Sequence, residues 1–171
     1  LIVPFKGLDQ EMEKNIQALL GQDYPKKEII FVAHSREDSS YPFLQKYKKK
    51  AKIVIRDEKY QACSYKVASL LTGVAKARKE VLAFSDSDVR PGRQWLRELV
   101  QPLSFSDVGA STSALWYIPP AGGLSTCLQA AWFSSTRFSI LPKPKKDFLM
   151  GCSFALKKET FDSLDIRNLW E

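Results

Sequence analysis

Two aspartates, Asp86 and Asp88, stand one residue apart directly after the apolar run 81–85. Such a run predicts a β-strand that emerges from a core, and side chains alternate along a strand, so both carboxylates lie on one side of its exposed end. Mg²⁺ and Mn²⁺ bind hard oxygen ligands of this kind and usually keep open positions that substrate phosphates fill. The spacing therefore indicates a divalent-cation site for a substrate that carries a diphosphate.

The same residues also fit a simple turn. Asp-Ser-Asp followed by Pro91 and Gly92 has the composition of a loop or a helix cap, because short acidic side chains accept hydrogen bonds from nearby backbone N–H groups. Clusters of this composition mark loops in most proteins. The motif alone does not decide between a turn and a metal site, so the surrounding elements must.

Strand-like and helix-like segments alternate before this motif. Strands are predicted over 1–3, 28–33, 52–55 and 81–86, and helices over 10–20, 41–50 and 64–79. This alternation predicts the α/β class, with a mostly parallel central sheet, flanking helices and right-handed crossovers. Ligands of such sheets bind outside the carboxyl ends of the strands. The segments 4–7, 34–35 and 86–88 should therefore converge on one rim.

After Asp88 the pattern changes. A short helix is predicted over 92–100 and a strand over 108–113, and an apolar segment follows over 124–141. This segment and its approach are rich in aromatic side chains, namely Trp116, Trp132, Phe133 and Phe138. A core helix is one interpretation, and a helix lying partly in a membrane interface is the other, since basic residues follow it.

Composition and charge bound the class of protein. The chain has 171 residues, 44% of them hydrophobic, which suffices for one domain with a buried core. No apolar run approaches the roughly 18 residues that a membrane span needs. The first residues lack the pattern of a signal peptide and already read as a strand, without an initial Met, so we expect a fragment of a longer protein.

The net charge of +7 favours an anionic partner such as nucleic acid, a membrane surface or a phosphorylated substrate. Much of this charge lies in two clusters, which are Lys46, Lys48, Lys49, Lys50 and Lys52, and Lys143, Lys145 and Lys146. The cysteines Cys63, Cys127 and Cys152 lack metal-site spacing and predict buried thiols in a reducing compartment. The single His34 cannot build a histidine-rich metal site.

Several motifs occur in a fixed order along nearly the whole chain. They are the segments 2–7, 22–25 and 28–32, the residue Lys66, and the segments 86–90 and 151–158. Together they resemble an inverting family 2 glycosyltransferase domain, closest to the ceramide glucosyltransferase group and its bacterial lipid-glycosylating relatives. The resemblance implies the GT-A fold, a UDP-sugar donor such as UDP-glucose, a ceramide-like or other lipid hydroxyl acceptor, and Mg²⁺ or Mn²⁺.

The resemblance also implies roles for individual residues. Asp88 would be the direct metal ligand, with Asp86 close to the metal, the ribose and the diphosphate. Lys66 would organise the uracil and phosphate pocket. The nucleotide would be bordered by Pro4, Phe5, Lys6 and Gly7 after the first strand and by Ser35 after the second. The cation neutralises the leaving diphosphate, and inversion needs a carboxylate that takes the acceptor proton.

The sequence departs from the family pattern in two places. Relatives carry an aspartate just after the second strand, where this chain has His34 and Ser35, with Glu37 and Asp38 slightly later. The family's catalytic aspartate and its Gln-x-x-Arg-Trp motif follow the Gly-x-Ser segment, so the catalytic base is expected beyond Glu171.

We accordingly expect a single, incomplete glycosyltransferase domain over 1–171. Residues 1–92 would form its nucleotide-sugar-binding half, and residues 93–171 would begin the acceptor-side half. The transmembrane helices of the family would lie outside these residues, and the protein would be associated with the cytoplasmic face of a membrane.

The sequence argues against two other classes of protein and is compatible with a third. A nucleotidyltransferase would need a Gly-rich basic phosphate loop near the first strand, and the segment 4–7 is too short for one. A nucleic-acid-binding module would interleave exposed aromatics with basic residues on a strand platform, and the sequence shows no such pattern, so no nucleic acid is expected. A catalytically silent domain that binds a nucleotide sugar or a protein partner stays open.

Overall fold

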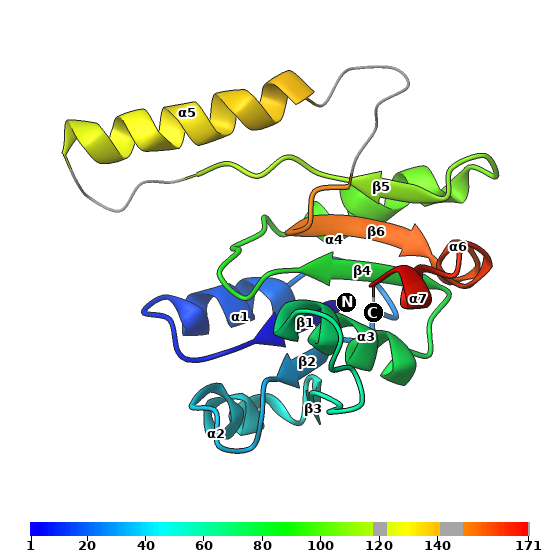
Figure 1. Ribbon diagram of the computed structural model, residues 1–171. Coiled ribbons are helices and arrows are strands. Elements are labelled where there is room, and N and C mark those ends of the chain that lie inside the picture. Colours follow the sequence, from blue (N-terminus) through cyan, green and yellow to red (C-terminus); the bar gives the residue numbers. More distant parts are fainter. Residues whose placement is uncertain (118–122, 141–148, 171) are drawn as a thin grey trace.

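The computed structural model describes residues 1–117, 123–140 and 149–170, with the backbone alone over 136–140. Its centre is a six-stranded sheet with the strand order β3-β2-β1-β4-β6-β5 (Figure 1). The strands are β1 (Ile2–Phe5), β2 (Ile30–Ala33), β3 (Lys52–Ile55), β4 (Val81–Ser85), β5 (Ala110–Thr112) and β6 (Ser153–Lys157).

The sheet is mostly parallel, which confirms the predicted fold class. β1 pairs in parallel with β2 and β4, and β2 with β3. Only β6 runs the other way, since it pairs antiparallel with both β4 and β5. The register places Ser153 opposite Ser85, so β6 begins at the same edge at which β4 ends.

Helices flank this sheet at nearly the predicted places. They are α1 (Met12–Leu20), α2 (Ser40–Leu44), α3 (Tyr65–Lys76), α4 (Trp95–Val100), α5 (Leu124–Ile140), α6 (Lys158–Ser163) and α7 (Ile166–Trp170). The predicted helix over 41–50 is shorter than expected, because a 3₁₀ turn at Gln45–Tyr47 follows α2. A second 3₁₀ turn, Gln101–Ser104, extends α4. No helix in the described ranges is long and apolar enough to cross a membrane.

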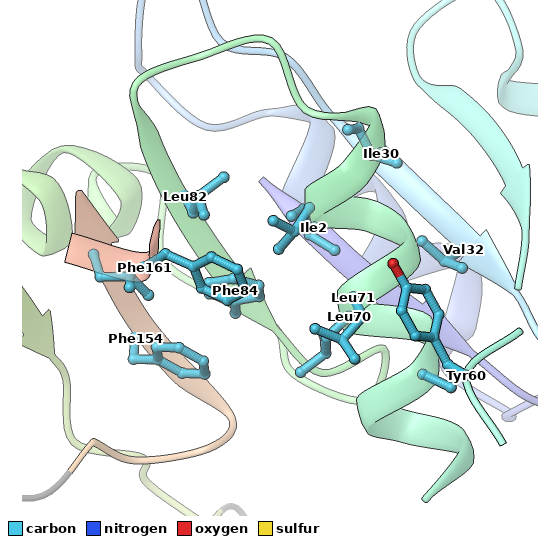
Figure 2. Packing of buried hydrophobic residues seen from close by; sticks show 13 residues of the cluster. Ile2, Ile30, Val32, Tyr60, Leu70, Leu71, Leu82, Phe84, Phe154 and Phe161 are labelled. Atoms are coloured by element: carbon cyan, nitrogen blue, oxygen red, sulfur yellow. The ribbon is translucent and has the colours of Figure 1, made fainter. Parts of the chain in front are cut away.

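Both faces of the sheet are covered by apolar side chains. On one face, Ile2 and Phe84 pack with Leu71 of α3, and with Phe154 and Phe161 (Figure 2). The opposite face packs Val3, Phe5 and Phe31 against Met12, Ile16 and Leu19 of α1 and against Leu44 of α2. Burial of each large side chain contributes about 1.5–3 kcal/mol, so the alternation along β1 fixes which face meets which helix.

Helix α3 lies unusually close to β1. A Cβ atom at Gly73 would stand 2.3 Å from Ile2 Cγ2, so only glycine permits this approach. The helix begins after Ser64, whose hydroxyl accepts a hydrogen bond from the Val67 N–H at 3.3 Å. Because α3 connects the end of β3 to the start of β4, its first turn lies at the carboxyl ends of the strands.

Helix α5 lies apart from the sheet in Figure 1. Leu124, Leu128 and Trp132 are 76%, 61% and 70% exposed, so the interpretation of this segment as a core helix is wrong for the chain as described. These three side chains lie largely in solvent, while the faces of the sheet are covered by other helices. The side chain of Phe138, the cluster Lys143, Lys145 and Lys146, and Glu171 lie outside the described residues.

Candidate active site

The loops that leave β1, β2, β3 and β4 share one edge of the sheet, which we call the carboxyl rim. Phe5 is level with Ala33, and Ala33 with Ile55, so Lys6, His34 and Arg56 emerge side by side. Asp86 follows β4 on the other side of β1. The predicted convergence of the segments 4–7, 34–35 and 86–88 is therefore confirmed.

An ion pair joins α3 to the end of β4 at this rim. The Lys66 Nζ atom lies 2.6 Å from Asp86 Oδ1, and the two side chains are 39% and 26% exposed. Lys66 stands in the first turn of α3, which the Ser64 cap and the Gly73 contact hold against the sheet. The pair leaves a fixed positive charge beside a carboxylate, at an edge open to solvent.

Asp88 differs from Asp86 in its surroundings. Its side chain is exposed, and within the described ranges its carboxylate has neither a hydrogen bond nor an ion-pair partner. The residues that the structure describes contain no group of three or more His, Cys, Asp or Glu side chains that would form a complete metal cage. Asp88 and Asp86 fit instead a cation that takes one or two protein carboxylates and fills its other positions from substrate and water.

Two buried polar side chains hold the loop that follows Asp88. The Asn15 amide donates to the Ser87 carbonyl at 3.2 Å and accepts from Arg90 Nε at 3.2 Å. The Gln22 amide donates to the Gly92 carbonyl at 2.9 Å and accepts from the Leu96 N–H at 2.9 Å. Asn15 and Gln22 are 3% and 2% exposed. Sequence reasoning assigned them no role, although Asn15 is a polar residue on the apolar face of α1.

The residues predicted after β1 divide into two groups. Phe5 is 2% exposed and its ring packs edge-on against Phe31, so its side chain lies in the core and only its backbone borders the rim. Lys6 and Gly7 are the residues that reach the rim. The Lys6 ammonium lies 4.1 Å from the centre of the Tyr65 ring, a cation–π contact. Pro4 is half-buried within the strand.

The loop after β2 is tied to the turn after β1. The Gly7 N–H donates to both carboxylate oxygens of Asp38, at 2.9 and 3.1 Å, and the Ser35 hydroxyl accepts from the Asp38 N–H at 3.2 Å. Burial acts to raise the pKa of the Asp38 carboxyl, but hydrogen bonds from Ser40 and Gly7 and the charge of His34 outweigh it and hold that pKa below its ordinary value. Ser35 thus lies at the rim as predicted, but its hydroxyl supports Asp38.

A pocket of about 410 Å³ opens between these loops and the start of α3. It is lined by His34, Arg56, Glu58, Tyr60, Gln61, Cys63 and Tyr65. His34 Nδ1 and Arg56 Nε are buried atoms that no other atom in the described part of the chain satisfies with a hydrogen bond. The Tyr65 ring stands edge-on to His34, with 5.7 Å between ring centres. A buried donor without a partner is costly, so these atoms favour a polar ligand.

A cavity of about 420 Å³ lies elsewhere, at the amino ends of the strands. It is lined by residues such as Leu1, Tyr24, Glu28, Val81 and Leu96, which precede the strands or flank their starts. None of the predicted site residues borders it. Its position at the amino ends of the strands separates it from the carboxyl rim, so the pocket lined by His34 and Arg56 is the candidate site.

The start of β6 completes the rim on the far side of β4. The Trp95 indole N–H donates to the Ser153 hydroxyl at 2.9 Å and contacts the Ser113 hydroxyl at 3.3 Å. The two serine hydroxyls also bond to each other. Ser113 follows β5 and leads toward α5. The Gly-x-Ser segment therefore lies beside Asp86, with the exposed helix α5 beyond it.

Comparisons with known sequences match this arrangement to glycosyltransferases. The chain is 28% identical over 128 residues to Glycosyltransferase AglE of Haloferax volcanii, covering 72% of this chain and 41% of that protein. It is 29% identical over 121 residues to a ceramide glucosyltransferase of Komagataella phaffii, covering 66% and 24%. The chain thus spans less than half the length of these relatives.

Solved structures show the same fold. A mannosyltransferase of Pyrobaculum calidifontis, in complex with GDP-mannose and Mn²⁺, superposes with a TM-score of 0.63 at 20% identity, over 95% of this chain and 45% of that one. Glucosyl-3-phosphoglycerate synthase of Mycobacterium tuberculosis, in complex with Mn²⁺, UDP-glucose and phosphoglyceric acid, gives 0.60 at 17% identity, over 92% and 55%. The architecture is that of GT-A glycosyltransferases, as predicted.

The resemblance to the ceramide glucosyltransferase group is confirmed at the level of family. The model of glycosyl transferase family 21 matches residues 1–164, nearly the whole chain. With the sheet order, the rim carboxylates and the curated relatives in agreement, the chain belongs to glycosyl transferase family 21.

Proposed function

We propose that this chain is the donor-binding part of a metal-dependent, inverting glycosyltransferase that moves a sugar from a UDP-sugar to a lipid hydroxyl. One observation carries the proposal: Lys66 holds Asp86 at the end of β4 while Asp88, two residues on, is exposed and unpaired among the described residues. A divalent cation needs carboxylates and a diphosphate needs positive charge. Both kinds of group lie here at the edge of the sheet where ligands bind.

The proposed roles follow from what each side chain can offer. Asp88, with Asp86 beside it, would hold Mg²⁺ or Mn²⁺, which when bound supplies positive charge to the departing nucleoside diphosphate. Lys66 orients the Asp86 carboxylate through their ion pair, and its ammonium adds positive charge beside the diphosphate. The loop that carries Asp88 is held by Asn15 and Gln22, so its carboxylate is placed before the donor arrives.

The rim pocket suits the base of the nucleotide. Its volume of about 410 Å³ can hold a ring system, and the Tyr65 ring lines it. Arg56 Nε can donate to a carbonyl oxygen, and His34 Nδ1 can donate or accept according to its tautomer. Uracil presents two carbonyl oxygens and one N–H, so it can satisfy both buried atoms. This match between uracil and the two buried atoms supports a uridine donor. His34 and Arg56 would then take the place of the aspartate that relatives carry after the second strand.

The acceptor is proposed to approach from the side of β6 and α5. The donor half would comprise residues 1–92, and the acceptor-side half would begin at 93. Exposed Leu124, Leu128 and Trp132 give α5 an apolar surface, and no acidic residue occurs over 108–146, where the charged residues are all Lys or Arg. A helix of this kind suits the interface of an anionic membrane, the site of a lipid acceptor. This supports a protein associated with the cytoplasmic leaflet.

Titration calorimetry of the 171-residue chain tests the proposal. UDP should bind in the presence of Mn²⁺ and much more weakly after chelation, because Asp88 and Asp86 would hold the cation and its charge would favour the diphosphate. GDP should bind less well than UDP if uracil satisfies His34 and Arg56. A single-stranded oligonucleotide serves as the control for bulk positive charge, and binding of the oligonucleotide in preference to UDP would overturn the proposal.

The proposal also assigns the general base to a segment outside residues 1–171. Loss of general-base assistance lowers rates by about 10²–10⁴-fold, so this chain should bind UDP-glucose yet transfer little glucose to ceramide. Rapid transfer by these residues alone would contradict that assignment. Donor binding without any transfer, even by a longer chain that includes the proposed base, would instead indicate a silent nucleotide-sugar-binding domain.

A further inference from the structure

Asp38 is the most heavily hydrogen-bonded carboxylate at the carboxyl rim. The Gly7 N–H reaches both of its oxygens, and the Ser40 N–H and hydroxyl donate to Oδ1 at 2.8 and 2.6 Å. Ser40 is fully buried at the start of α2. Asp38 therefore joins the turn after β1 to a buried anchor across a separation of 31 residues.

The turn that Asp38 holds has a conformation that needs support. Gly7 has φ of +74°, in the left-handed region, and no atom lies within 4 Å of the place where a Cβ would stand. Neighbouring side chains thus do not shape the turn. The hydrogen bonds from its N–H to Asp38 tie this exposed turn to the rest of the protein.

This turn after β1 also sets the position of Lys6. The Lys6 ammonium lies over Tyr65, and Tyr65 stands against His34 at the wall of the rim pocket. Tyr65 also precedes Lys66, the partner of Asp86. One chain of contacts thus runs from Asp38 through Gly7 and Lys6 to the pocket.

We propose that Asp38 is a positioning residue for the donor site: it does not touch the donor but fixes the Lys6–Gly7 turn so that the rim pocket is formed before the nucleotide binds. Its carboxylate oxygens are occupied by Gly7 and Ser40, which leaves little capacity for a ribose or a base. This assignment rests on the proposed function, since it presumes that the pocket takes the nucleotide.

Two measurements test the role of Asp38. The first follows the Gly7 amide by NMR without ligand: its shift should titrate with the Asp38 carboxyl in the unsubstituted chain and not in Asp38→Asn, and its hydrogen exchange should accelerate in Asp38→Ala. The second measures UDP affinity by calorimetry, with and without Mn²⁺. Asp38→Ala should weaken binding by about tenfold or more under both conditions, because misplacement of a binding group acts on every ligand contact it supports.

The variants separate positioning from direct contact and from folding. Asp38→Asn keeps one acceptor oxygen for Ser40 and should recover part of the affinity, and Ser40→Ala, which removes one donor, should lose less than Asp38→Ala. Glu28→Ala is the matched control, because Glu28 accepts the Arg78 N–H at 2.9 Å across 50 residues but at the opposite edge of the sheet. It should lower stability without changing UDP affinity.

Each failure has its own signature. If the Gly7 amide neither titrates with Asp38 nor exchanges faster in Asp38→Ala, the hydrogen bond between Gly7 and Asp38 does not hold the turn. If the UDP affinity of Asp38→Ala is unchanged, Asp38 has no positioning role in the donor site. If Asp38→Ala lowers UDP affinity only in the presence of Mn²⁺, Asp38 is a metal ligand and not a positioning residue. Absence of UDP binding by the unsubstituted chain would overturn the proposed function, whereas the Gly7 measurement would still report on the tie.

Discussion

The Lys66 ammonium lies 2.6 Å from the Asp86 carboxylate, although the two residues belong to different elements, α3 and the loop after β4. The pair places a cation and an anion at the rim of the sheet, where both side chains are partly exposed to solvent. Such a half-exposed pair contributes little to stability, at most about 1 kcal/mol. Its position is therefore better explained by binding than by folding.

Replacement of Lys66 tests that explanation. Lys66→Gln should reduce Mn²⁺-dependent UDP affinity by about tenfold, the loss of one charge-assisted contact, while the melting temperature changes little. Calorimetry and thermal denaturation measure the two effects. Lys14→Gln is the control, because Lys14 pairs with Glu11 at 2.9 Å on the exposed side of α1. A large loss of stability without a loss of affinity would make the Lys66 pair structural.

Asp88 should be needed for the metal and not for the fold. Asp88→Asn should abolish the Mn²⁺-dependent component of UDP binding and leave the free energy of unfolding within about 0.5 kcal/mol, because its side chain is exposed. Asp86→Asn should weaken binding less completely. The exposed Asp107→Asn serves as a control for lost charge. If Mn²⁺ raises the UDP affinity of Asp88→Asn as much as it raises that of the unsubstituted chain, Asp88 does not belong to the metal site.

Gln22 should affect both stability and binding. Gln22→Ala leaves the buried Leu96 N–H without its partner and releases the Gly92 carbonyl, so we expect a loss of about 2–3 kcal/mol in urea denaturation. Because the loop after Asp88 is then less ordered, Mn²⁺-dependent UDP affinity should fall as well. Gln22→Glu keeps the acceptor for the Leu96 N–H, so its stability and its UDP affinity should lie between those of the unsubstituted chain and those of Gln22→Ala. Destabilisation with unchanged UDP affinity would separate this anchor from the site.

The stability that Asp38 provides should depend on pH. Its pKa is lower in the folded chain than the ordinary value, so its contribution is complete above that ordinary value and is lost as the pH falls through the folded value. The difference in unfolding free energy between the unsubstituted chain and Asp38→Asn should therefore be largest near neutral pH and shrink below about pH 4. Urea denaturation at both pH values measures it. A difference that grows in acid would contradict the sign.

Membrane attraction should depend on where the basic residues lie. Binding to anionic liposomes should weaken with salt, since each lysine near the surface contributes on the order of 1 kcal/mol that ions screen. Substitution of Lys143, Lys145 and Lys146, which follow α5 in the sequence, by glutamate should reduce sedimentation with liposomes. The same change at the exposed Lys48, Lys49 and Lys50, beyond α2, should not. Equal losses in both triple variants would mean that only bulk charge acts.

The local pattern of the sequence determined much of the fold. Runs of apolar residues and helical spacing predicted β1 to β4, α1, α3 and α4 within a few residues, because burial on a face repeats with the period of the element. The predicted length of α2 was wrong, since α2 ends at Leu44. The local pattern also placed Asp86 and Asp88 at a strand end, since that needs only the position where an apolar run stops. For Lys66, only the family resemblance indicates a role, because its contact with Asp86 joins separate elements.

Tertiary structure decided what the local pattern leaves open. Asn15 and Gln22 hold a loop 70 or more residues away, and Asp38 holds Gly7 across 31 residues, so no neighbour in the sequence signals these contacts. The reversed direction of β6 was equally hidden, because a buried strand has the same composition whichever way it runs. Helix α5 has the apolar content of a core helix, yet its exposure depends on what the other elements already cover, and that is set only when the whole chain packs.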